Sequence, residues 1–143
     1  MNGRRRRLLL ETLDPMLAPG EQVEVTTIVN LSSVSVARTA AFAAASAALS
    51  GGMAVIPVPT PMYLAVTDLN LYIFQADSMF ARPRAHLMTI PRAGLVRTPV
   101  KERILNSSFV VSHPEADQGL RLIFGGLGRR ERDLVAAALP VAG

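Results

Sequence analysis

Short apolar segments separated by turn residues make up most of the chain after residue 20. Residues 21–31 alternate in part and are rich in β-branched side chains, which predicts a strand. Further segments of this kind, bounded by Gly, Pro, Asn or Asp, are predicted strands: residues 62–67, 71–75, 86–90, 95–100, 104–112 and 120–124. Many short strands at this spacing predict a mainly β (α+β) domain built as an antiparallel barrel or sandwich.

A closing helix is predicted at residues 129–139. Its apolar side chains fall on one stripe, with Arg132 off that stripe, so one face should pack on the sheet. A helix placed after the last strand would close a partly open barrel. The preceding Gly125–Gly128 segment predicts a strand-to-helix connection that uses positive φ angles. The apolar stripe consists of Leu127, Leu134, Val135, Ala138 and Leu139.

The N-terminal residues form a basic helical extension. Leu9, Leu10 and Leu13 have helical spacing, and Pro15 should end the helix. We therefore divide the chain into an extension, residues 1–20, and a β-rich domain, residues 21–143.

An uncharged segment interrupts the strand pattern after the first strand. Residues 40–50 are nearly all alanine, which favours a helix, and Gly51 and Gly52 should end it. Prolines then recur up to residue 61 and prevent the helix from continuing. We interpret residues 39–61 as an apolar, Ala-rich helical insertion.

The insertion has one face with larger side chains. On a helical wheel Phe42, Leu49 and Met53 share a face with Arg38, and small residues lie opposite. These three apolar side chains are candidates for contact with a membrane or a partner. Strongly apolar residues contribute only about −0.3 to −0.6 kcal/mol each to membrane insertion, so insertion is marginal. Three interpretations remain open: a helix docked on its own domain or on a second subunit, a membrane-associated segment, or a mobile loop.

The positive charge is concentrated at the N-terminus. The formal net charge is +4, and the run Arg4, Arg5, Arg6 and Arg7 accounts for all of it. These side chains, together with Arg38, are candidates for binding an anionic surface. The other interpretation of these arginines is a solvated chain end with no binding role. Nucleic acid is less favoured, because basic charge is not spread along the chain and there is no Trp for base stacking.

Composition and motifs argue against catalysis. The chain has no Cys, which excludes a disulfide framework, a thiolate zinc site and a cysteine nucleophile. His113 lies in a predicted polar hairpin turn at residues 112–117, and His86 lies in a predicted strand. No nucleophile, base and orienting acid can be assembled from these residues. We therefore expect no catalytic residue, no metal and no cofactor.

The segment from Tyr63 to Phe74 resembles the strand-turn-strand signature of bacterial pleckstrin-homology-like (PH-like) domains. In that family a Leu/Val-Thr-Asp turn joins two apolar strands, and Val66-Thr67-Asp68 occupies that place here. Residues 87–92 and 120–139 are similar in order and spacing. The resemblance implies a seven-stranded antiparallel roll capped by a C-terminal helix, and a non-catalytic role in binding lipid, peptide or protein.

These expectations define two functional hypotheses. The first is a binding module that engages a protein partner or the inner membrane surface from the cytoplasm. The alternative is a small membrane-anchored protein whose Ala-rich segment inserts in the bilayer. Self-association through the Ala-rich helix is a further possibility, and an enzyme with an unrecognised site is the least expected class.

Overall fold

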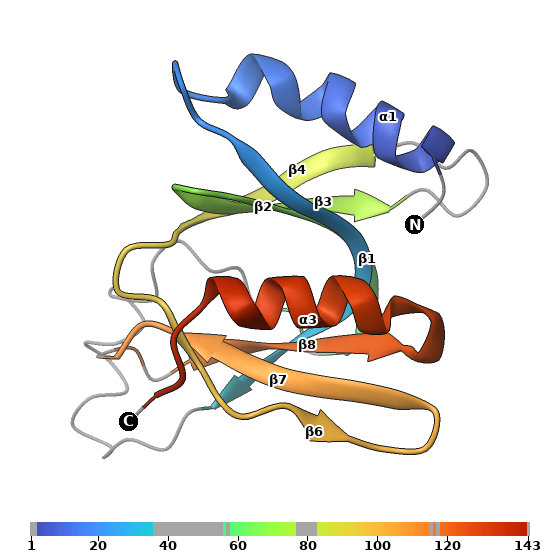
Figure 1. Ribbon diagram of the computed structural model, residues 1–143, viewed down its shortest axis with the longest axis vertical. Helices are drawn as coiled ribbons and strands as arrows, with labels where there is room; N and C mark the ends of the chain where they lie inside the picture. The colour runs from blue at the N-terminus through green and yellow to red at the C-terminus, as the bar shows by residue number, and fades with distance from the viewer. Residues whose placement is uncertain are drawn as a thin grey trace.

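The computed structural model describes residues 3–35, 56, 58–76, 83–114, 116 and 118–142, and the structural statements below concern these residues. Its elements are α1 (Gly3–Leu13), η1 (Asp14–Met16), β1 (Val23–Ser35), β2 (Thr60–Thr67), β3 (Asn70–Ala76), β4 (Pro83–Pro91), β5 (Val96–Arg97), β6 (Lys101–Glu102), β7 (Asn106–Ser112), β8 (Gln118–Gly125), η2 (Gly126–Gly128) and α3 (Arg129–Ala138). The strands form one antiparallel sheet in the order β4-β3-β2-β1-β8-β7-β5, with β6 paired to β7 (Figure 1).

Strand β1 belongs to both halves of this sheet. Its first part, Val23–Leu31, pairs with β2, and its last part, Asn30–Ser35, pairs with β8. The strand curves between the two pairings, so the half made by β2, β3 and β4 packs against the half made by β5 to β8 (Figure 1). The result is an open antiparallel roll, with β4 and β5 as its two edges.

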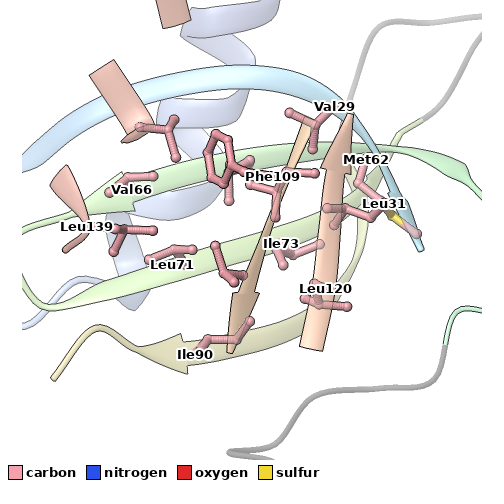
Figure 2. Packing of buried hydrophobic residues seen from close by; sticks show 14 of the residues in the cluster. Val29, Leu31, Met62, Val66, Leu71, Ile73, Ile90, Phe109, Leu120 and Leu139 are labelled. Atoms are coloured by element: carbon pink, nitrogen blue, oxygen red, sulfur yellow. The ribbon is translucent and has the colours of Figure 1, made fainter. Parts of the chain in front are cut away.

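The main core lies between the two halves and beneath α3. Apolar side chains from every long strand meet there, among them Val66, Ile73 and Phe109 (Figure 2). Phe109 stacks on Phe124 with ring centroids 5.6 Å apart. Leu139, directly after α3, is buried in the same cluster, so the closing helix caps the roll as predicted.

The buried face of α3 differs from the predicted stripe. Leu134 is 47% exposed and Leu127 is fully exposed, so their predicted burial was wrong. The prediction that Arg132 lies off the packed face was also wrong, because this side chain is buried. The buried positions follow helical spacing and are Arg132, Val135, Ala136 and Leu139.

Helix α1 covers the outer face of the β2–β3 half, as Figure 1 shows. Leu9 and Leu13 are fully buried against side chains of β2 and β3, and Leu10 is only partly buried. Both faces of these two strands are therefore covered, which explains why they read as continuous apolar runs rather than as alternating ones. This second cluster consists of Leu9, Leu13, Tyr63, Ala65, Tyr72 and Phe74.

Three local predictions need correction. Residues 95–112 form three strands, because 96–97 and 101–102 are short strands paired with β7, and 104–105 is a turn. The sheet consequently has eight strands rather than the seven that the resemblance implied. Positive φ among the described glycines occurs at Gly20 and Gly94, not at Gly125–Gly128.

The Ala-rich insertion lies almost entirely outside the described residues. Arg38, Phe42, Leu49 and Met53 are therefore not placed, and their proposed contacts stay predictions. Near its end, Ile56 is buried and exchanges two 2.7 Å hydrogen bonds with Ser33 on β1. Among the described helices, none has the length and apolar character needed to cross a membrane.

Candidate functional site

The Arg4–Arg7 cluster divides between two sides of α1. Arg5 lies four residues before Leu9, so it shares the buried face, and its Nη1 donates a hydrogen bond to the Tyr63 hydroxyl at 3.3 Å. The other three side chains, Arg4, Arg6 and Arg7, are exposed. Within the described part of the chain these three form no ion pair. Three of the four predicted cations are thus presented to solvent on a helix fixed to the sheet.

A groove separates α1 from α3, with the start of β1 as its floor. It encloses about 220 Å³ and is lined by Arg6, Glu24, Val25, Thr26, Arg130, Glu131 and Leu134. The start of α3 and the start of α1 therefore lie close together. The groove contains both charge signs, and Glu24 is already paired with Arg92 at 2.9 Å. The half-exposed Leu134 is its apolar side chain of greatest size.

A second hollow is more strongly basic. It lies on the outer face of β6, β7 and β8, has a volume of about 350 Å³, and has no carboxylate in its lining. Lys101 pairs with Ser108, and Ser108 pairs with Ile123, so these three positions form a row across neighbouring strands. The hollow is lined by Lys101, Arg103, Asn106, Ser108, Arg121 and Ile123. Three cations with amide and hydroxyl donors form a surface suited to anions.

Sequence reasoning missed this basic hollow. The available signal was the period of two in the strands: Leu120 and Leu122 face the core, so Arg121 between them must face outward. By the same rule Lys101 and Arg103 lie on one side of the chain and Glu102 on the other. The register of three strands is needed to bring these cations together.

The acidic side chains near the hollow form ion pairs with Arg132. Its guanidinium contacts Glu102 at 2.7 Å and Asp133 at 2.8 Å, and it donates to the Ser107 hydroxyl at 3.2 Å. The hydrogen bond to Asp133, supported by Glu102, raises the pKa of Arg132 above its usual value despite burial. Arg132 therefore has a structural role: it ties α3 to β6 and β7 and keeps two carboxylates away from the exposed cations.

The turn between β2 and β3 is held by Thr67. Its hydroxyl accepts hydrogen bonds from the backbone N–H groups of Leu69 at 3.1 Å and Asn70 at 2.9 Å. Asp68 accepts a 2.8 Å hydrogen bond from the Gln22 backbone, which links the turn to the residue before β1.

Beside this turn, the Glu21 carboxylate is buried and accepts only internal hydrogen bonds. Its donors are the hydroxyls of Thr67 and Tyr72, the amide of Asn70 and the backbone N–H of Ala18. Burial alone would raise the pKa of Glu21, but these hydrogen bonds, led by that of Thr67, hold the pKa below its ordinary value. Burial and the bond to Glu21 raise the pKa of Tyr72. This network is a structural joint between the N-terminal extension and the β2–β3 hairpin.

The two histidines do not come together. His86 is exposed, its Nε2 lies 2.8 Å from the Thr89 hydroxyl, and its ring packs edge-on to Phe74. His113 lies in the predicted polar turn but is half-buried, and burial lowers its pKa. Its Nε2 has no hydrogen-bond partner among the described residues. No group of three metal-ligating side chains occurs within the described ranges.

The comparisons with known proteins concern the fold. No protein-family model matches the chain, and a search of curated proteins gave no significant match. Among solved structures, the chain is similar to one described as showing a critical structural role for the PH and C1 domains of the Vav1 exchange factor, with 14% sequence identity and a TM-score of 0.53. The alignment covers 95% of this chain and 33% of that one. Together with the order of strands and the closing helix, this likeness shows that the chain has a PH-like fold.

Proposed function

We propose that this PH-like domain is a non-catalytic binding module that attaches to an anionic membrane surface from the cytoplasmic side. The observation that carries the proposal is the set of three exposed arginines on α1, Arg4, Arg6 and Arg7, which have no acidic partner among the described residues. The helix is held in place by Leu9 and Leu13, so its cations are presented from a fixed platform.

The attraction is electrostatic and additive. A basic residue near an anionic surface contributes about 1 kcal/mol, so three of them contribute about 3 kcal/mol and about a hundredfold in binding. Salt should weaken it, because exposed charges are screened within a Debye length.

The test uses flotation of the intact chain with vesicles of phosphatidylcholine alone or mixed with phosphatidylglycerol. We expect binding to the anionic vesicles at low salt and about a hundredfold loss in the triple variant R4Q/R6Q/R7Q. The matched pair of single variants is Arg6→Gln and Arg5→Gln: each removes one charge, and Arg5→Gln, on the inward side of α1, should reduce vesicle binding less. Absence of flotation of the intact protein at low salt would refute the membrane proposal.

A protein partner is the second candidate. The observation that favours it is the groove between α1 and α3, where the half-exposed Leu134 lies among charges of both signs. A partner bound there would be displaced by Leu134→Gln, and vesicle binding would be unaffected because the charge is unchanged. The alternative that residues 39–61 anchor the protein predicts a membrane fraction that resists both high salt and alkaline extraction.

A further inference from the structure

Three aliphatic side chains protrude from one end of the roll. Ile104 and Leu105 form the turn between β6 and β7, and Leu127 lies in η2; they are 94%, 82% and 103% exposed. The two segments are adjacent, because a Cβ on Gly126 would lie 3.9 Å from the Leu105 carbonyl oxygen. We call these three residues the apolar tip. A single exposed aliphatic residue is ordinary, but a cluster on two neighbouring turns indicates a contact surface.

The turn that carries the tip is well formed. The Arg103 N–H donates a 2.8 Å hydrogen bond to the Asn106 carbonyl, and Asn106 lies opposite Gly125 in the β7–β8 pairing. The side chains of Ile104 and Leu105 are therefore held outside the roll by paired strands on both sides of the turn. Their exposure follows from the register of the sheet and not from a loose chain end.

Cations lie on both segments that carry the apolar tip and on the strands beside them. The basic hollow contributes Lys101, Arg103 and Arg121, and the first turn of α3 contributes Arg129 and Arg130. The nearby carboxylates are Glu102 and Asp133, which are paired with the buried Arg132, and Glu131 in the first turn of α3. Together with Arg132 these side chains carry six positive and three negative formal charges, so the apolar tip is flanked by a net positive charge.

The two arginines of α3 run against the preference of a helix. The N-terminus of a helix carries a partial positive charge, so cations there reduce helix stability. Arg129 and Arg130 occupy the first two positions of α3, next to Leu127. Glu131 in the same turn suits the helix N-terminus, whereas the two arginines raise the positive potential beside the tip.

This combination fits one kind of surface. A protruding apolar group can insert into a bilayer without a complementary pocket. The anionic headgroups then attract the neighbouring cations at the level of the phosphates. A second copy of the chain would bring two net positive surfaces together, which is unfavourable. A protein partner would need both a deep apolar pocket and acidic side chains around it.

We infer that the apolar tip inserts into an anionic membrane while the hollow of Lys101, Arg103 and Arg121 and the start of α3 bind lipid phosphates. This inference rests on the membrane attachment proposed above and adds to it the apolar contact that sets how deeply the domain enters the bilayer. The arginines of α1 can reach the same bilayer, because Arg6 and Arg130 line one groove. In Figure 1, α1 begins at the same side of the view as the β6–β7 turn and η2.

The chain has no Trp, so a single introduced tryptophan reports its own surroundings. We choose Ile104→Trp in the tip and, as the matched control, Leu69→Trp in the β2–β3 turn, where Leu69 is 50% exposed. With phosphatidylcholine–phosphatidylglycerol vesicles, the I104W emission should shift to the blue and be quenched by lipids brominated on their acyl chains. The L69W emission should stay unchanged in the same titration.

A second experiment separates apolar from ionic contact. We expect the triple variant I104S/L105S/L127S to lose about tenfold or more in vesicle affinity at both low and high salt, because it removes apolar insertion. The variant K101Q/R103Q/R121Q should lose affinity at low salt only. All six positions are solvent-exposed, so thermal unfolding should be unchanged and will exclude misfolding as the cause.

The outcomes distinguish the two claims. Vesicle binding by the intact chain without a blue shift of I104W overturns this inference and leaves the proposed attachment through α1 standing. No vesicle binding at all overturns both. A blue shift that depends on protein concentration and not on vesicles overturns the inference in favour of self-association through the tip.

Discussion

The orientation of α3 can be tested by two leucine substitutions five residues apart. Leu139 is 3% exposed and belongs to the main core, whereas Leu134 is 47% exposed and faces the groove beside α1. Leu139→Ala removes three buried carbon atoms, worth about 2.4 kcal/mol at about 0.8 kcal/mol per methylene. The cavity left behind adds to this, so the expected loss is about 2–5 kcal/mol.

Leu134→Ala should cost much less. About half of its side chain is already in water, so the lost transfer free energy is about 1 kcal/mol, and the higher helix propensity of Ala offsets part of it. For a domain of this size 1 kcal/mol corresponds to about 3–4 °C in Tm, so Leu139→Ala should lower Tm by about 8 °C or more. Leu134→Ala should lower it by no more than about 3 °C.

Urea unfolding followed by circular dichroism measures the loss of unfolding free energy in each variant. Equal m-values confirm that the same surface is exposed on unfolding in both. If Leu134→Ala is as damaging as Leu139→Ala, the assignment of the packed face of α3 is wrong. The helix would then be rotated toward the stripe that the sequence pattern predicted.

Two further predictions concern the N-terminal part of the chain. Leu13→Ala should destabilise the domain by about 2–5 kcal/mol in urea unfolding, because Leu13 is fully buried between α1 and the sheet; an unchanged midpoint would show that α1 does not contribute to the fold. The depressed pKa of Glu21 means that its contribution to stability is complete above the unfolded-state value of about 4.3 and is lost as pH falls through the lower folded-state pKa. The stability difference between the wild type and Glu21→Gln should therefore shrink from pH 5 downward, and a difference independent of pH would contradict the role of the carboxylate.

The strands were predictable because their apolar pattern is strong. Residues 62–66 and 71–74 are uninterrupted apolar runs, and the structure shows why: α1 covers one face of β2 and β3 and the core covers the other. The sequence predicted helical spacing for Leu9 and Leu13 but did not reveal which surface they cover. That surface is formed by strands about fifty residues later in the chain.

The packed face of α3 was not predictable from helical periodicity alone. An arginine is expected on the solvated side of a helix unless buried polar groups can pair with it. For Arg132 those groups are Glu102 on β6 and Ser107 on β7. With Arg132 buried, the helix is turned by about one residue, which is about 100°. Leu134 is then brought from the predicted core stripe to the groove.

Charge summed along the sequence hid the basic surface. Beyond Arg4–Arg7 the charges cancel in number, which suggested a neutral domain. Strand alternation separates them in space: Glu102 turns toward Arg132, whereas Lys101 and Arg103 turn outward and meet Arg121 from β8. Net charge is a property of the sequence, but a binding surface depends on which face each charge occupies.

The position of α1 restricts where this domain can bind. The outer face of β2 and β3 is covered by α1, so the outer face of β6, β7 and β8 is the broad sheet surface left open among the described strands. The apolar tip lies at the end of β8, whereas β1 leaves the sheet at Ser35, beside the start of β8. Seven residue steps at about 3.3 Å separate those ends by about 23 Å. A domain with its tip in a bilayer therefore holds the end of β1 about 23 Å from the tip along β8, on the side away from the membrane.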